Sequence, residues 1–258
     1  MSAAVAPGAQ RFVAHAMGMP ISLALRGAHA EDSAGVRAWE DVLAQVVEVD
    51  RMFSTYRADS FVSRLGRGEV TIDGCPPEVA EVLDLGERAA ERSDGAFSVW
   101  RDDRTGARRL DTDGIVKGWA IERAAAALRR LPDTDFCLSA GGDMVCHTAL
   151  PAGQAWVVGI EDPLDAARLV ATVRVRRGAV ATSGSAHRGD HVVDARTGRP
   201  PTGVASVTVV ADRLTWADID ATSSFARGPE AAAWLEQRPG RVGLVVWKDG
   251  STTTIGRL

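Results

Sequence analysis

Apolar residues recur along the chain with two different periods. The apolar positions of residues 32–53 lie three or four residues apart, which predicts an amphipathic helix. The same spacing predicts helices over residues 77–93 and, with many alanines, over about 115–130. Residues 11–26 instead hold short apolar runs interrupted by a glycine and a proline, which is typical of two strands around a bend.

Valine-rich segments dominate from residue 135 onward and read as strands: DFCLSA, AWVVGIE, RLVATVRVR, GAVATS, VASVTVVA and RVGLVVW. Helices are predicted near 215–227 and 229–237. The order lacks a regular alternation of strand and helix, so we expect an α+β fold with mostly antiparallel sheets and flanking helices. No repeat or long linker stands out, and we expect one domain over residues 1–258, with its core at about 13–250.

Composition narrows the class of protein. The 258 residues are 45% hydrophobic and 25% charged, an ordinary globular balance, and the net charge of −4 gives no footprint for nucleic acid. Three cysteines without CxxC spacing argue against a disulfide framework and a structural zinc site. We find no secretory signal or lipobox and no apolar run of the ~20 residues that a membrane helix needs. We therefore expect a cytoplasmic protein without a membrane span.

The segment LDTDGIVKGWAIERAAAAL places Asp111 and Gly114 before or at the start of a helix and Lys117 in its first turn. The N-terminus of a helix is a common phosphate-binding site, and Lys117 can add a positive charge that attracts a phosphate. The alternative is an ordinary capped helix with Asp113 as N-cap and Lys117 exposed. Both interpretations stay open on this segment alone.

In TWADIDATSSFARG, Asp218 and Thr222 are four residues apart and share one helix face. A carboxylate and a hydroxyl so placed are suitable oxygen ligands for Mg²⁺. In the alternative, Asp218 stabilises the helix N-terminus and Thr222 bonds back to a carbonyl. Asp220 points to another face, where we expect it to be solvated.

The segment AVATSGSAHRGDHVVDARTGRP contains His187 and His191, four residues apart. A zinc pair at that spacing needs a helix, and Gly189 argues against one. We expect a short strand that carries His191 and Asp194. His191 is either a proton-handling group or a satisfied structural histidine.

Three further stretches are ambiguous by themselves. Tyr56, the only tyrosine, and the turn Gly95-Ala96-Phe97-Ser98 could each line a flat pocket for an aromatic ring, or form a corner of the core. Gly141-Gly142-Asp143, after the strand DFCLSA, indicates a turn and nothing more.

The order of these segments carries more information than any one of them. The series F-S-T-Y-R-x-x-S, D-G-A-F, L-D-x-x-G-I-x-K-G-x-A, S-A-G-G-D, W-x-V-G-I-E-D-P, A-T-S-G, H-V-V-D-A-R-T-G and A-D-x-x-A-T closely resembles the ApbE family of FAD:protein FMN transferases. The resemblance spans roughly residues 13–250. It implies Mg²⁺-dependent transfer of FMN from FAD to a Thr or Ser hydroxyl of a target protein, with release of AMP.

The resemblance also implies roles for individual residues. It assigns FAD contacts, with Met17 and Tyr56 at the flavin, to Met17, Tyr56, Ala96, Phe97, Ser98, Asp111, Lys117 and Val192. It assigns Mg²⁺ ligands to the carbonyl of Gly114 and the side chains of Asp218 and Thr222. It implies that the residues acting in catalysis are His191, Lys117 and Asp218.

The chain departs from the family pattern at Asp113 and Ala195, where glycine and proline are usual. Two other functions stay open: Mg²⁺-dependent hydrolysis of FAD to FMN and AMP, and FAD binding without turnover. The intact set of Lys117, Asp218 and Thr222 favours catalysis. Each of these three functions requires the helix that carries Lys117 and the helix that carries Asp218 to meet at one cavity.

Overall fold

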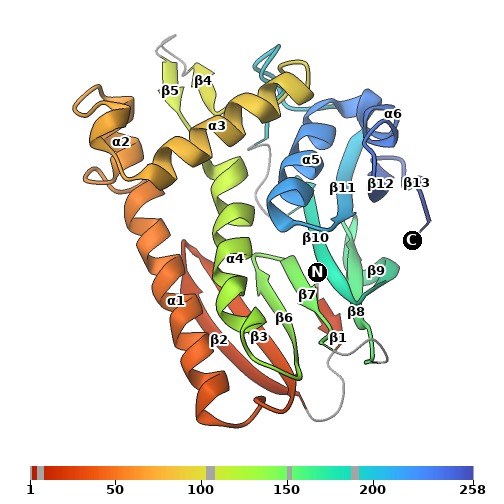
Figure 1. Cartoon of the computed structure of the whole chain (residues 1–258). Helices are drawn as coiled ribbons and strands as arrows, with labels where there is room; N and C mark the ends of the chain where they lie inside the picture. Colours follow the sequence, from red (N-terminus) through yellow and green to blue (C-terminus); the bar gives the residue numbers. More distant parts are fainter. Residues whose placement is uncertain (1, 5–8, 103–107, 150–152, 187–191, 258) are drawn as a thin grey trace.

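The fold has three layers: helices, a large sheet and a smaller sheet (Figure 1). This computed structural model describes residues 2–4, 9–102, 108–149, 153–186 and 192–257. No helix within those ranges combines the length and the apolar character that a bilayer crossing requires.

Five of the helices confirm the sequence prediction. They are α1 (Ser33–Phe53), α3 (Pro77–Arg92), α4 (Asp113–Arg129), α5 (Leu214–Ala226) and α6 (Ala231–Glu236). The pattern did not predict the short α2 (Phe61–Gly66) or the 3-10 turns at Ile72–Gly74 and Gly228–Glu230.

The strands form antiparallel pairs throughout the described chain. The eight-stranded sheet has the order β13-β12-β11-β10-β7-β6-β3-β2, β1-β8-β9 form a smaller sheet and β4-β5 a hairpin. The expected α+β fold with antiparallel sheets is therefore confirmed. The strand bounds are β1 Ser2–Ala4, β2 Gln10–Ala16, β3 Met19–Gly27, β4 Trp100–Asp102, β5 Arg108–Leu110, β6 Thr134–Ala140, β7 Asp143–His147, β8 Trp156–Asp162, β9 Asp165–Val175, β10 Arg177–Gly184, β11 Val204–Ala211, β12 Val242–Trp247 and β13 Thr252–Ile255.

Alternating side chains pack the large sheet on both faces. Leu23 and Leu25 of β3 belong to the core that the sheet shares with α1, α4 and α5. Ala24, between them, belongs to a second core that contains Trp156 of β8 and other side chains of the smaller sheet. Because successive strand residues point to opposite faces, β3 serves both cores. The sheet is thus covered by helices on one face and by β8 and β9 on the other.

Helices α4 and α5 meet at a close crossing. The backbone N–H of Gly118 donates to Asp218 Oδ2 at 3.1 Å, and a Cβ added at Gly118 would lie 2.8 Å from Asp218 Cβ. One turn further on, Glu122 accepts hydrogen bonds from the backbone and hydroxyl of Thr215 at the start of α5. The missing side chain at Gly118 therefore permits the approach, and Glu122 fixes it.

The expectation that Asp220 is solvated is wrong. Asp220 is 1% exposed, and its carboxylate lies 2.5 Å from Arg241 Nε and 3.8 Å from Arg92 Nη2. Most residues of α5 are buried, so the face opposite Asp218 is covered as well. The helical spacing correctly separated the two aspartates, but it could not show that both faces are covered.

Candidate functional site

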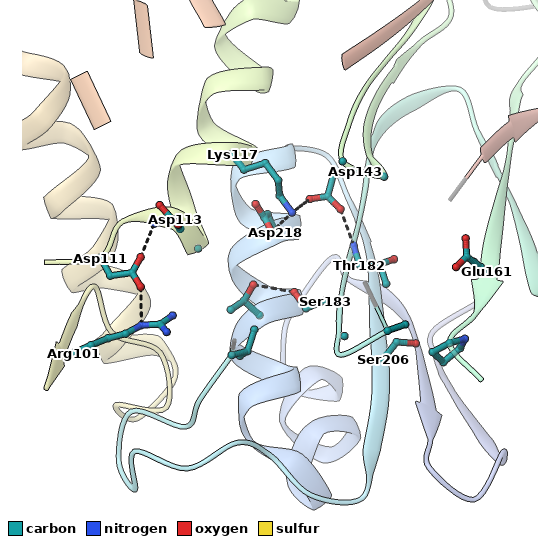
Figure 2. Close-up of a pocket in the computed structure, with 18 residues that line it drawn as sticks. Arg101, Asp111, Asp113, Lys117, Asp143, Glu161, Thr182, Ser183, Ser206 and Asp218 are labelled. Atoms are coloured by element: carbon teal, nitrogen blue, oxygen red, sulfur yellow. Dashed lines mark hydrogen bonds and ion pairs between the residues drawn. The ribbon is translucent and has the colours of Figure 1, made fainter. Parts of the chain in front are cut away.

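A cavity of about 230 Å³ lies where α4, α5, the β6–β7 turn and the end of β10 meet (Figure 2). A second cavity, of about 760 Å³, adjoins it and shares Asp111, Gly114 and Thr222 as wall residues. The structure therefore brings together residues that are more than 100 positions apart in sequence. The predicted site residues that line the first cavity are Asp111, Gly114, Lys117, Val192, Asp218 and Thr222.

Lys117 is held between two buried carboxylates. Its Nζ lies 2.5 Å from Asp143 Oδ2 and 3.5 Å from Asp218 Oδ1. Asp143 also accepts a hydrogen bond from the backbone N–H of Thr182 at 3.0 Å through its other oxygen, Oδ1. The alternative of an exposed Lys117 is wrong, because its side chain is 19% exposed and ion-paired.

The buried carboxyl of Asp218 has a perturbed acidity. Burial raises its pKa to about 7, with Asp143 adding to the rise while Lys117 opposes it. Two carboxylates against one ammonium leave an excess of one negative charge when all three groups are ionised. A cation beside Asp218 would favour its ionised form.

Thr222 lies one turn beyond Asp218 on α5. Its Oγ1 is 2.9 Å from Ser183 Oγ of β10. A Cβ added at Gly114 would lie 3.9 Å from Thr222 Cγ2 and 2.9 Å from Phe97 Cε2. Gly114 is therefore packed between Thr222 and Phe97, and a side chain at this position would collide with the phenyl ring.

The oxygen donors in this wall suit a magnesium ion better than zinc. Within the described ranges, no group of three or more His, Cys, Asp and Glu residues is arranged to hold a metal ion. Asp218 and Thr222 bring a carboxylate and a hydroxyl oxygen to this wall, which Gly114 also lines. Mg²⁺ commonly binds through one or two carboxylates and completes its shell with waters and substrate phosphates. The donor set and the excess negative charge therefore fit Mg²⁺.

Asp111, and not Asp113, caps the start of α4. Asp111 Oδ1 accepts from the backbone N–H of Asp113 at 3.1 Å, and Asp111 Oδ2 lies 3.0 Å from Arg101 Nε. The residue at the N-cap position, Thr112, makes no side-chain cap. The interpretation of Asp113 as N-cap is therefore wrong, and Lys117 lies in the second turn of the helix.

The second cavity is lined by the Ala96-Phe97-Ser98 turn and by the turn that follows Asp194. The backbone N–H of Ala195 donates to the carbonyl of Ala96 at 3.0 Å and so joins the two turns. A proline at position 195 would lack this N–H. The departure at Ala195 thus adds a hydrogen bond to the cavity wall.

Met17 and Tyr56 line neither cavity in the described part of the chain. Met17 sits in the β2–β3 turn with φ +51° and packs against the two cores on either side of the turn. Tyr56 follows α1 and is 94% exposed. Both residues thus lie outside the two cavity walls, although Met17 packs against the core that contains Phe97, and their contact with the flavin stays a prediction.

The predicted histidines lie outside the described residues. His187 and His191 both fall in the range 187–191, whereas Val192 is described and lines both cavities. The expected strand through Asp194 is wrong for residues 192–194, the part of it that the structure describes. Asp194 forms only an isolated bridge with Arg199 across a tight turn.

Asp143 and Ser183 are site residues that the sequence did not predict. Asp143 belongs to the S-A-G-G-D motif, where two glycines between strands indicated only a turn. Ser183 follows Thr182 at the end of a valine-rich strand, and its neighbour Thr222 is 39 positions away. The one available signal was the acidic residue directly after the paired glycines.

A family model described as the ApbE family matches residues 17–102 and 98–246. Among curated relatives, an Escherichia coli (strain K12) FAD:protein FMN transferase is 29% identical over 153 residues, 55% of this chain and 44% of the relative. The Rhodobacter capsulatus protein of the same name is 34% identical over 156 residues, 55% of this chain and 29% of the relative. The matches therefore span less than half of the length of these relatives.

Solved structures of two proteins show the same fold. The apo form of the Pseudomonas stutzeri flavinyl transferase ApbE superposes with a TM-score of 0.80 and 22% identity, covering 95% of both chains. The ApbE protein of Thermotoga maritima gives a TM-score of 0.78 and 20% identity, covering 95% of this chain and 96% of the other. At these identities the likeness speaks for the fold alone.

Proposed function

Because the chain belongs to the ApbE family, we propose that it transfers FMN from FAD to a Thr or Ser hydroxyl of a target protein with the aid of Mg²⁺. The observation that carries the proposal is the buried cluster of Lys117, Asp143 and Asp218 in the wall of a cavity between two helices. A cationic group beside a buried, negatively charged oxygen site suits a metal-bound diphosphate.

We assign the binding of the FAD diphosphate to Lys117 and the N-terminal end of α4, where the helix dipole favours anions. We assign Mg²⁺ to Asp218, Thr222 and the carbonyl of Gly114. The ion would neutralise charge on the diphosphate when it is bound. The Ala96-Phe97-Ser98 turn lines the adjoining cavity and is the proposed contact for the rest of the dinucleotide.

The transfer is a displacement at the phosphorus of the FMN half of FAD. The acceptor hydroxyl oxygen forms the new bond to phosphorus, the bond to the AMP phosphate oxygen breaks, and AMP leaves with that electron pair. The hydroxyl proton passes to a general base, for which His191 is the predicted candidate. Positioning and charge stabilisation would supply most of the acceleration.

A direct test incubates the full chain with FAD, MgCl₂ and a domain bearing an Asp-Gly-x-Ser/Thr-Gly-Ala-Thr acceptor sequence. Flavin fluorescence that stays with the acceptor in a denaturing gel supports transfer. Free FMN and AMP without labelling would identify a hydrolase, and intact FAD in a yellow complex would identify a binding protein.

The Asp218→Ala variant should lose turnover by more than a hundredfold and still fold, because one buried metal oxygen is removed. Asp212→Ala is the matched control, since Asp212 is exposed just before the same helix. Full activity of Asp218→Ala in the presence of Mg²⁺ would contradict the assigned metal site.

A further inference from the structure

The first cavity continues beyond the Lys117–Asp143 pair, away from the predicted FAD contacts. We call this continuation the far arm. In Figure 2, Glu161 and Ser206 lie on the opposite side of that pair from Asp111. None of the residues assigned above to FAD or Mg²⁺ belongs to the far arm. We assign to it Glu161 and Ser206 and, from the same cavity lining, Pro163, the β10 residue Gly184 that pairs with Ser206, and the turn residues Gly141 and Gly142.

Ser206 brings an unpaired polar atom to this arm. The residue is 3% exposed, and its Oγ has no hydrogen-bond partner among the described residues. Burying a hydroxyl without a partner costs free energy, so such groups usually have a ligand or a water. The Ser206 hydroxyl lies in the cavity wall and is therefore available to bond to a molecule that enters the arm.

Two strand pairings are irregular beside residues of the arm. The pairing of β8 with β9 shifts register on both sides of Glu161. The pairing of β11 with β12 shifts between Val204 and Ser206. Bulges re-aim side chains and are frequent beside active sites. The extra residue of the second irregularity is Ala205, directly before Ser206, and the extra residues of the first lie on β9, opposite Glu161. Both sheets are therefore irregular where they border this wall.

Most of the remaining residues in this wall are glycines. Gly141 and Gly142 have φ values of +55° and +97°, which other residues adopt at a cost. A Cβ at Gly184 would lie 2.9 Å from the carbonyl oxygen of Ala205. The wall at these positions is therefore formed by backbone, whose N–H and C=O groups can bond to a bound main chain.

We propose that the far arm binds the hydroxyl-bearing segment of the acceptor protein, with the Ser206 hydroxyl bonded to the backbone of that segment. This inference rests on the proposed function. Displacement at phosphorus brings the attacking and leaving oxygens roughly into line, on opposite sides of the transferred group. With the AMP half of FAD in the adjoining cavity, an acceptor in the far arm would approach opposite the leaving oxygen, as that geometry requires.

The test compares Ser206→Ala with Ser223→Ala in the full chain. Both variants remove a buried serine hydroxyl without a partner, and Ser223 lines neither cavity. The acceptor is a fluorescently labelled peptide with the sequence used above, and two quantities are measured: its KM in the transfer reaction and its Kd by anisotropy. We expect Ser206→Ala to raise both about fivefold, the effect of one lost hydrogen bond, with FAD affinity and thermal midpoint unchanged. Ser223→Ala should match the wild type.

Two results would overturn the far-arm inference and leave the proposed function intact. In the first, the wild type labels the peptide and Ser206→Ala has the same peptide KM and Kd as the wild type. In the second, Ser206→Ala also loses affinity for FAD. A wild type that consumes FAD without labelling the peptide would instead contradict the proposed transferase, and the anisotropy comparison would still decide the far arm. A wild type that neither labels nor binds the peptide would overturn both.

Discussion

Asp143 connects the sheet to the proposed phosphate-binding lysine. One oxygen of its carboxylate accepts from the backbone of β10, and the other pairs with Lys117 Nζ. The carboxylate therefore holds Lys117 from a rigid strand end, while Asp218 approaches the same ammonium from α5. We regard Asp143 as a positioning residue that also contributes negative charge to the cation site.

The Asp143→Asn variant keeps the shape of the side chain and removes its charge. We expect the apparent Mg²⁺ affinity to fall about tenfold, because a charge opposite to that of the ion, worth roughly 1–2 kcal/mol at a partly screened site, is lost. The measurement is a MgCl₂ titration of FAD binding, followed by flavin fluorescence. Asp212→Asn, an exposed change of the same charge, should leave the titration unchanged. Equal Mg²⁺ affinity in Asp143→Asn and the wild type would mean that Asp143 has only a structural role.

A site residue could be predicted from the sequence when its partner lies close to it along the chain. Asp218 and Thr222 share a helix face, and four-residue spacing was enough to pair them. The contact of Lys117 with Asp143 depends on how α4 sits over the β6–β7 turn, which no local pattern reports. The same reason explains why Ser183, beside Thr222, was missed.

At the scale of elements, Glu122 fixes the crossing of α4 and α5. Its carboxylate receives the Thr215 backbone N–H at 2.9 Å, the Thr215 hydroxyl at 2.6 Å and Arg213 Nε at 2.6 Å. Burial tends to raise the pKa of Glu122, but the bonds from Thr215 and Arg213 outweigh it and hold the pKa below the usual value. A negative charge at the start of α5 also complements the helix dipole.

This lowered pKa predicts a pH-dependent stability. Because the pKa is lower in the folded state, Glu122 stabilises fully above its unfolded pKa, near 4.5, and the contribution is lost as the pH falls through the folded pKa. Glu122→Gln should lower the free energy of unfolding by about 2 kcal/mol at pH 7. Its deficit relative to the wild type should shrink below about pH 4.5.

Urea unfolding of both proteins between pH 3 and 7 checks this expectation. Glu48→Gln is a suitable control, because Glu48 is exposed and lies 3.5 Å from Arg51. A constant difference between Glu122→Gln and the wild type across the whole range would show that the charge of Glu122 does not stabilise the fold.

Element prediction found the long helices, missed short elements such as α2 and β13, and misjudged the burial of α5. Helices α1 and α3 are amphipathic, so their spacing defined both. Strand β13, Thr252–Ile255, is four residues long and too short to show a period. Helix α5 is buried on several sides, so its apolar residues do not mark one face and Asp220 was misplaced.

At the scale of the whole molecule, the first cavity joins two separately packed regions. Ile115 and Val116 of α4 belong to the core that α4 shares with α1, α3 and the β4–β5 hairpin. Ala217 and Ala221 of α5 belong to the main core beneath the large sheet. Each helix also reaches the other core, α4 through Ile121 and α5 through Ile219, so a ligand held by both helices strengthens a link that the helices already make.

This position predicts cooperative stabilisation by FAD and Mg²⁺. A ligand that binds only the folded state at 100 times its Kd stabilises by about 2.7 kcal/mol, which raises the thermal midpoint of a protein of this size by roughly 5–10 °C. We expect FAD with MgCl₂ to reach this shift and either component alone to give less than half of it, because the proposed ion is held partly by the diphosphate. The measurement is differential scanning calorimetry of the full chain.

Asp218→Ala should remove the Mg²⁺-dependent part of the shift, whereas Asp212→Ala should retain it. An equal shift with FAD alone, unchanged by MgCl₂ or by Asp218→Ala, would show that the dinucleotide binds without an ion at Asp218.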